Sequence, residues 1–278
     1  MVTELAREAL EIENLVPPAP TSSSRWRRRP ALLLGVASLA IVLASWQLFA
    51  DKNWVNPAFS SKPSAIWDAF FQMYIVKHTI YSQLWASAEE ILWGFGLALV
   101  VGIPVGVALG QFRFFRYVGE PYVIALYATP TVAFFPLLTL WFGIGLASKV
   151  ALIFVGTIMQ IMISSQGGVE NTDPRLVEMA RSYRATPGQL FRRVFLPSAA
   201  PHILVGIRLA IGRAIIMMFI AELVSSNRGI GFVVSNSANL YQTAPMFVGI
   251  FTLMAIGIVL NSTMRMIERR RFAYLPSR

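Results

Sequence analysis

The sequence predicts an all-α integral membrane protein with six transmembrane helices and both termini in the cytoplasm. Hydrophobic residues make up 55% of the 278 residues, charged residues only 14%, and the mean hydropathy is +0.58. A soluble domain needs a more polar surface than this composition supplies. The net charge of +10 comes from Lys and Arg that gather between the apolar runs, which indicates membrane sidedness and no nucleic-acid partner.

The lengths of the apolar runs predict the six spans, because one bilayer crossing takes about 20 residues. The spans lie at 31–50, 88–110, 121–142, 148–166, 203–224 and 244–264. With the amino terminus inside, the cytoplasmic segments hold 18 of the 24 Lys and Arg, and the outer segments hold five. This split fixes the predicted orientation. We therefore expect a cytoplasmic tail at 1–30, a transmembrane domain at 31–264 with a cytoplasmic loop at 167–202, and a basic cytoplasmic tail at 265–278.

The first span and the segment after it are read as anchors. The span 31–50 follows a basic run, but it is longer than a signal-peptide core and no small-x-small cleavage site follows it, so we expect it to be retained. We expect residues 1–24 to be poorly ordered. After the span, Pro63 starts a short helix whose aromatic residues share one face: Trp67, Phe70, Phe71 and Tyr74. That face predicts an anchor at the outer membrane interface, with a docking surface for an external partner as the alternative.

Glycines and prolines mark the second and third spans. Gly102, Gly106 and Gly110 fall four residues apart, a spacing that favours close helix packing, with a moving contact as the alternative. Pro130 and Pro136 in the third span each remove a backbone hydrogen bond and free carbonyl groups. Broken membrane helices accompany solute pathways, so the prolines predict either a pathway or a structural kink.

Polar residues inside the spans are the candidates for a solute pathway. They are Thr129, Thr131, Gln160, Arg213 and Glu222. Arg213 and Glu222 are nine positions apart on one predicted helix, which places them on opposite faces about 14 Å apart, so each needs its own partner. Arg213 is held either by carbonyl groups or polar side chains such as Gln160 or Asn261, or it faces the pathway and offers a positive charge to an anionic solute.

The cytoplasmic loop predicts two short helices joined at 184–186. Asp173 followed by Pro174 is typical of an N-cap with proline at the first helical position, and it starts a helix at about 174–184. Thr186 and Gln189 have the spacing of a capping box and start the second helix. We expect this second helix to end before Pro197.

The same loop resembles the coupling loop of bacterial ATP-binding-cassette importers. Glu178, Ala180, Val194, Leu196 and Pro197 fall in register with that family's pattern, whereas Met179 replaces an Ala and Arg184 replaces a Gly. An arginine in a left-handed conformation costs on the order of 1 kcal/mol. Either the loop turns differently here, or Arg184 gains a contact with a carboxylate of the ATPase. The resemblance implies that the ATPase contacts are Glu178, Met179, Ala180, Arg181, Arg184, Ala185, Thr186 and Leu190.

A second stretch sharpens the resemblance. Residues 127–136 with the Trp141-Phe142-Gly143-Ile144-Gly145 ending resemble permeases of the sulfonate, nitrate and taurine importer group, and the likeness runs from about residue 80 to 268. It implies the fold of a type I importer permease in the bacterial cytoplasmic (inner) membrane. It also implies a homodimer of permeases, two ATP-binding subunits that carry the ATP and Mg²⁺, and an external solute-binding protein that delivers a small anion.

Other functional classes have less support. A secondary transporter driven by an ion gradient is the first alternative, but the coupling loop and the lack of inverted repeats oppose it. An intramembrane enzyme is the second. The chain has no cysteine and only two histidines, and it contains neither a P-loop nor a Gly-x-Ser-x-Gly motif. We therefore expect no catalytic residue, cofactor site or metal site on this chain.

Overall fold

The computed structural model describes residues 25–52, 54 and 59–271, and every regular element within them is a helix. The predicted tail at 1–24 and residues 272–278 lie outside the described residues. The chain divides into two units at Trp54. The first unit contains α2 (Arg25–Asp51), which begins before the predicted span because the basic run joins the helix. Its segment Leu33–Asp51 is long and apolar enough to cross a membrane.

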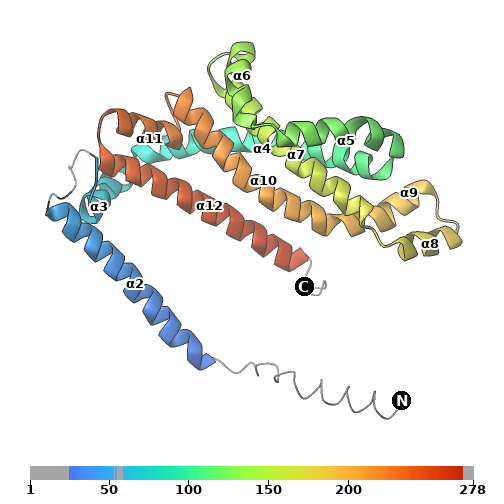
Figure 1. Cartoon of the computed structure of the whole chain (residues 1–278), viewed down its shortest axis with the longest axis horizontal. Coiled ribbons are helices and arrows are strands. Elements are labelled where there is room, and N and C mark those ends of the chain that lie inside the picture. Colours follow the sequence, from blue (N-terminus) through green and yellow to red (C-terminus); the bar gives the residue numbers. More distant parts are fainter. Residues whose placement is uncertain (1–24, 53, 55–58, 272–278) are drawn as a thin grey trace, which may run out of the picture. The chain divides into compact units, whose positions relative to one another are not determined.

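The second unit contains all the other elements (Figure 1). Its long helices are α4 (Thr79–Gln111), α7 (Leu146–Glu170), α10 (Leu196–Val224) and α12 (Thr243–Arg271). Each of them is long and apolar enough to cross a membrane. With α2 these make five spans among the described residues, or six if the bent pair of α5 with η2 and α6 forms one span. The elements in chain order are α3 (Pro63–Phe71), η1 (Gln72–Val76), α4 (Thr79–Gln111), α5 (Arg113–Ala128), η2 (Thr131–Phe134), α6 (Phe135–Phe142), α7 (Leu146–Glu170), α8 (Pro174–Ser182), α9 (Pro187–Leu190), η3 (Phe191–Phe195), α10 (Leu196–Val224), α11 (Ile230–Asn239) and α12 (Thr243–Arg271).

Helix α7 is the centre of the second unit, because it packs along both α4 and α10. The glycines of α4 make this approach possible. A Cβ at Gly102 would lie 3.1 Å from Cγ2 of Ile161, and one at Gly110 would lie 2.7 Å from Cβ of Val169. The predicted packing role of these glycines is therefore seen in the contact between α4 and α7.

The third predicted span is broken at Pro130. Helix α5 ends at Ala128, and the segment Thr131–Phe142 turns away from it by 93°. Thr129 Oγ1 donates a hydrogen bond of 2.8 Å to the carbonyl oxygen of Ala125, so one carbonyl group that the break frees finds a partner. The sequence correctly predicted a break here, although the run 121–142 forms two helical segments and not one straight crossing.

The loop between α7 and α10 forms the two predicted short helices, α8 and α9. The Asp173 side chain accepts a hydrogen bond of 2.8 Å from the Arg175 N–H. Thr186 and Gln189 form the predicted capping box, with hydrogen bonds of 3.3 and 2.9 Å. The expected end before Pro197 is wrong, because the helical path continues through η3 into α10. The π-turn pairs the Leu196 N–H with the Phe191 carbonyl, and Pro197 then lies in the first turn of α10, where no N–H is needed.

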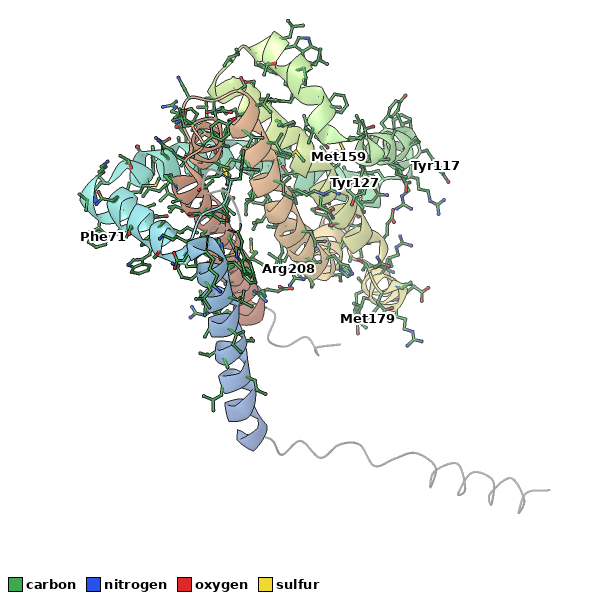
Figure 2. The ribbon with its side chains drawn as sticks, turned by 60° about the vertical axis from the view of Figure 1, so that its left-hand side comes forward. Phe71, Tyr117, Tyr127, Met159, Met179 and Arg208 are labelled. Atoms are coloured by element: carbon green, nitrogen blue, oxygen red, sulfur yellow. The ribbon has the colours of Figure 1, made fainter. Side chains whose placement is uncertain are left out.

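The aromatic face of α3 continues into η1. The rings of Phe70 and Tyr74 stack with centroids 4.4 Å apart, and Trp67 stacks on Phe70 at 5.8 Å. Tyr74 shares a hydrogen bond of 2.8 Å with Thr252 of α12. Trp67 and Phe71 remain exposed, and Figure 2 shows Phe71 at the margin of the second unit. The face therefore packs on α12 through Tyr74 and presents its other rings outward.

Candidate functional site

The residues predicted to contact an ATPase lie on or beside α8 and α9. Glu178, Met179, Ala180 and Arg181 belong to α8, Arg184 and Ala185 form the link, Thr186 caps α9, and Leu190 ends it. All but three are exposed: Ala180 and Ala185 are half-buried and Leu190 is buried. In Figure 2, Met179 lies at the edge of the molecule on this projecting segment.

Arg184 keeps the left-handed conformation that the family's glycine would adopt. Its φ is +55°. The Ala185 N–H donates to the Ala180 carbonyl at 3.1 Å, and the Arg184 N–H donates to the Arg181 carbonyl at 2.8 Å. This pair of hydrogen bonds is a Schellman motif, which ends α8 with Tyr183 as its C-cap and favours glycine at the position of Arg184. The alternative in which the loop turns differently is therefore wrong, and a contact between Arg184 and a carboxylate of the ATPase stays a prediction.

A groove of about 450 Å³ lies between α8 and the start of α10. Tyr183, which is 83% exposed, and Met179, which is 55% exposed, stand beside it. An exposed apolar and aromatic surface next to a groove is typical of a protein interface. The residues that line the groove are Leu176, Met179, Ala180, Tyr183, Arg193, Val194, Pro197, Ser198 and Pro201.

Arg213 of α10 stacks on Tyr127 of α5, with its guanidinium carbon 4.4 Å from the ring centroid. The Tyr127 hydroxyl donates to Gln160 Oε1 of α7 at 3.2 Å, and Gln160 Nε2 donates to Ser164 at 3.3 Å. These side chains join three elements, and Tyr127 is labelled in Figure 2. Arg213 is half-buried, so its charge remains accessible. Tyr127 is thus the partner that the sequence did not identify, standing between Arg213 and the predicted Gln160.

The two threonines near the break have different surroundings. Thr129 uses its hydroxyl group on the Ala125 carbonyl of its own helix. Thr131 begins η2, and its methyl group lies 3.6 Å from the position of a Cβ built on Gly156 of α7. Neither threonine has a hydrogen bond with the Arg213–Tyr127–Gln160 group. The structure therefore unites Gln160 and Arg213 through Tyr127 and leaves both threonines outside that set.

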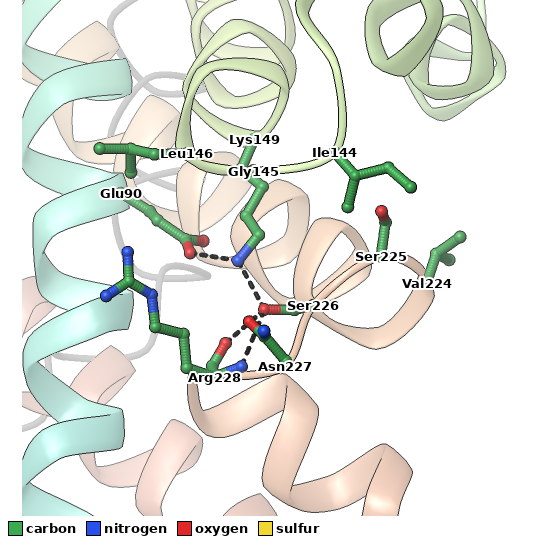
Figure 3. Close-up of a pocket in the computed structure, with 10 residues that line it drawn as sticks. All are labelled: Glu90, Ile144, Gly145, Leu146, Lys149, Val224, Ser225, Ser226, Asn227 and Arg228. Atoms are coloured by element: carbon green, nitrogen blue, oxygen red, sulfur yellow. Dashed lines mark hydrogen bonds and ion pairs between the residues drawn. The ribbon is translucent and has the colours of Figure 1, made fainter.

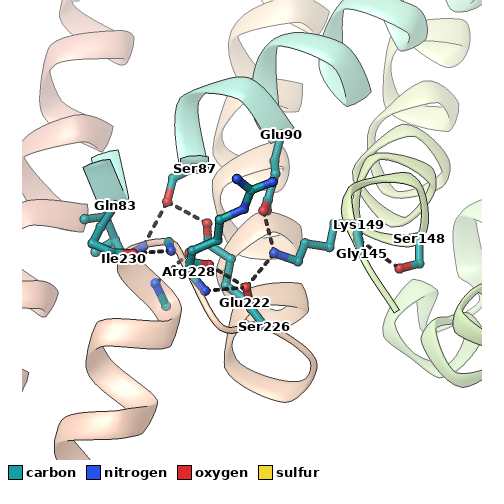
Figure 4. Close-up of polar contacts among 12 residues, drawn as sticks. Gln83, Ser87, Glu90, Gly145, Ser148, Lys149, Glu222, Ser226, Arg228 and Ile230 are labelled. Atoms are coloured by element: carbon teal, nitrogen blue, oxygen red, sulfur yellow. Dashed lines mark hydrogen bonds and ion pairs between the residues drawn. The ribbon is translucent and has the colours of Figure 1, made fainter. Parts of the chain in front are cut away.

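Glu222 lies elsewhere, in what we call the outer polar cluster: Ser87, Glu90, Lys149, Glu222 and Ser226 (Figure 4). The Ser87 hydroxyl donates to Glu222 Oε1 at 2.6 Å, and the Gly231 N–H donates to Oε2 at 2.6 Å. The expectation that Arg213 and Glu222 have separate partners is confirmed. Glu222 is fully buried, so it holds the start of α11 against α4 and α10 rather than facing an open path.

The rest of the outer polar cluster is a buried ion pair. Lys149 Nζ of α7 lies 2.6 Å from Glu90 Oε1 of α4, and their side chains are 5% and 2% exposed. Lys149 also donates to Ser226 Oγ at 2.6 Å. Direct contact between opposite charges offsets part of the cost of removing each charge from water. The second carboxylate oxygen, Glu90 Oε2, has no hydrogen-bond partner among the described residues. Lys149 thus links α7 to α4 through the ion pair and to the loop after α10 through Ser226, at the predicted outer end of the bundle.

Gly229 lies next to the outer polar cluster, at a position that only glycine can occupy. Its φ is +111°, and a Cβ there would collide with the Glu222 carboxylate. Its N–H donates to Gln83 Oε1 at 2.7 Å. Both the backbone angle and the close approach exclude any larger residue.

Sequence reasoning missed Glu90 and Lys149 as a pair. Glu90 falls at the start of the predicted span 88–110 and Lys149 at the start of the predicted span 148–166, each as a single charge. The available signal was that each charge lies at the end of an apolar run, where an ionisable residue needs a partner. Their separation of 59 positions gave no indication of which partner. Within the described residues, no three His, Asp or Glu side chains gather as a metal ion would need.

Comparison with known proteins agrees with this architecture. Residues 98–273 match the family described as binding-protein-dependent transport system inner membrane component. The taurine transport system permease protein TauC of Escherichia coli (strain K12) is 29% identical, over 88% of this chain and 91% of TauC. The putative aliphatic sulfonates transport permease protein SsuC of the same organism is 31% identical, over 85% of this chain and 89% of SsuC.

A solved structure shows the same fold. A chain of the inward-facing MetNI methionine ABC transporter superposes with a TM-score of 0.60 at 20% sequence identity, covering 70% of this chain and 96% of the other. At that identity the likeness concerns the fold, which is that of a type I importer permease. The relatives are transport permeases and not ATPases. This chain therefore belongs to the family of binding-protein-dependent transport system inner membrane components and is a multi-pass, non-catalytic permease of an ATP-binding-cassette importer.

Proposed function

We propose that the chain moves a small anionic solute across the bacterial inner membrane, after an external binding protein has delivered it. The TauC and SsuC relatives support this substrate class, since their names specify taurine and aliphatic sulfonates. The observation that carries the proposal is the half-buried Arg213, a cation that stacks on Tyr127 and has no acidic partner among the described residues. An arginine at that depth is costly unless it has a function or a good partner.

The assembly we propose contains two copies of this chain and two ATP-binding subunits. The ATPase pair contacts α8 and α9 at the predicted cytoplasmic end, with Glu178, Met179, Ala180, Arg181, Arg184, Ala185, Thr186 and Leu190 in or beside the interface. ATP-driven closure of the ATPases brings the two α8–α9 segments together and opens the permease pair outward. Hydrolysis then returns the pair to the inward-facing state. This chain performs no covalent step, and the ATP and Mg²⁺ bind to the partner.

Affinity purification of the tagged chain from its native membrane tests the assembly. The expected result is a complex that retains a nucleotide-binding subunit and whose ATP hydrolysis rises when the solute-loaded binding protein is added. A chain that purifies without any nucleotide-binding partner, and that takes up solute in response to an ion gradient, would establish the secondary-transporter alternative.

Substitution of Arg213 tests the anionic solute. We expect Arg213→Gln to lower ethanesulfonate uptake into proteoliposomes by about tenfold, which corresponds to losing one interaction of about 1.4 kcal/mol. Arg213→Lys, the matched control, keeps the charge and should retain part of the uptake, although it loses the planar stacking on Tyr127. Unchanged uptake kinetics in Arg213→Gln would remove Arg213 from the pathway, and loss of the assembled complex would assign it a structural role.

A further inference from the structure

A cavity of about 700 Å³ opens beside the outer polar cluster (Figure 3). Its wall is formed by the end of α10 and the loop after it, by the start of α7, and by Glu90 of α4. We call it the outer cavity. It is separate from the Arg213–Tyr127–Gln160 group, because none of those three residues lines it. The lining residues are Glu90, Ile144, Gly145, Leu146, Lys149, Val224, Ser225, Ser226, Asn227 and Arg228.

The wall of the outer cavity has a surplus positive charge. Lys149 is neutralised by Glu90 through the 2.6 Å ion pair. Arg228 is exposed, and it attracts the Glu90 carboxylate electrostatically without forming a direct ion pair with it. Glu222, the other acid of the outer polar cluster, accepts hydrogen bonds from Ser87 and Gly231 and does not line the cavity. Arg228 is thus the cation that a ligand in the cavity would meet.

Uncharged hydrogen-bond donors on the wall of the outer cavity also favour an anionic ligand. The backbone N–H groups of Ser226 and Asn227 have no acceptor among the described residues. At the start of α7 the N-cap is Gly145, which has no side chain to receive the first N–H groups of the helix. The positive end of that helix therefore meets the cavity wall uncapped. These uncharged donors add to the charge of Arg228, as N–H groups do where proteins bind oxyanions.

We propose that the outer cavity binds a small, singly charged oxyanion of the sulfonate class, with Arg228 as its principal ligand. The proposal rests on the proposed function, because it makes the cavity the first site that binds the solute after the binding protein releases it and before it reaches Arg213. The surplus of one cation on the lining residues matches a monoanion. Lys149 contacts both Glu90 and Ser226, so α4, α7 and the loop that carries Arg228 are held together at the cavity.

Thiol labelling tests the outer cavity directly, because the chain has no cysteine of its own. Asn227→Cys places a thiol on the cavity wall, and Asn239→Cys, at the exposed end of α11, is the matched control. The probes are two methanethiosulfonates of similar size, one with an ethanesulfonate group and one with a trimethylammonium group. The rate of modification is measured for each on the assembled transporter in membrane vesicles.

We expect the ratio of anionic to cationic labelling rates to be at least about fivefold higher at position 227 than at position 239. Free ethanesulfonate should slow labelling at 227 only. Adding Arg228→Gln should remove the excess, whereas Arg228→Lys should keep most of it. A monodisperse elution peak like that of the parent single-cysteine protein shows that each variant is folded.

Equal ratios at the two positions, or an excess that survives Arg228→Gln, would overturn the anion site. The readout needs neither ATP hydrolysis nor transport. Its failure therefore leaves the proposed import function standing, because that function is tested separately by co-purification of an ATP-binding subunit.

Discussion

Charge reversal at Glu178 is expected to abolish solute uptake while the chain remains inserted and folded. Glu178 is exposed on α8, and its side chain has no hydrogen bond or ion pair with the described residues. A surface substitution of this kind changes folding stability by no more than about 0.5 kcal/mol. A like charge introduced at an interface costs several kcal/mol, so Glu178→Lys should reduce coupled transport by about 100-fold or more. Uptake and ATP hydrolysis stimulated by the loaded binding protein are measured in proteoliposomes.

Arg113→Glu is the control for this reversal. Arg113 is exposed at the start of α5 on the same predicted side of the membrane, but outside α8 and α9. Its reversal should leave uptake near the normal value. Deletion of 184–186 is a stronger variant, because it removes the Schellman turn together with the N-cap of α9. Normal solute-stimulated ATP hydrolysis by Glu178→Lys would show that α8 is not the coupling element.

Removal of Lys149 is expected to have the largest effect on stability. Lys149→Ala leaves the Glu90 carboxylate buried without its cation, and breaking one side of a buried ion pair costs about 3–5 kcal/mol. We expect a strongly lowered thermal unfolding temperature for the detergent-solubilised transporter, measured by the loss of its monodisperse elution peak on heating. Glu90→Gln should be destabilising for the same reason, since it leaves the Lys149 ammonium unpaired.

The double variant Lys149→Met with Glu90→Gln separates the ion pair from the general packing. Removing both charges avoids an isolated buried ion, so the double variant should be more stable than Lys149→Ala. Arg208→Gln is the comparison for a more exposed pair. Arg208 and Glu268 lie 2.9 Å apart with side chains 33% and 30% exposed, and solvent screening makes their loss small. A double variant that is less stable than both single variants would contradict an ion-pair role.

The local structure of the coupling segment was predictable because it depends on neighbours in the sequence. Asp173 caps α8 and Thr186 caps α9 as expected, since a side chain needs only two or three following residues to satisfy the first N–H groups of a helix. The end predicted before Pro197 was wrong for a physical reason of longer range. The π-turn at Phe191–Phe195 lets the chain remain helical through Pro197. The rule that a helix ends before a proline does not consider a π-turn.

The candidate site was predictable only in part. Arg213 and Gln160 were found because polar residues stand out inside apolar spans, and the separation of Arg213 from Glu222 followed from helix geometry. Tyr127 was not assigned as the partner of Arg213, since its role depends on α5, α7 and α10 meeting. The outer polar cluster was missed as a unit, because Glu90 and Lys149 are far apart in the chain.

The sequence by itself determined what composition and short spacings control: a membrane protein, the approximate spans, the proline break and the capped helices of the cytoplasmic loop. Each of these follows from hydrophobic burial over about 20 residues or from hydrogen bonds within one turn. Only the tertiary structure decided which distant groups meet. It pairs Lys149 with Glu90, stacks Arg213 on Tyr127 and leaves Arg228 exposed at the outer cavity. These contacts arise from helix packing around α7, which brings together residues that no local pattern connects.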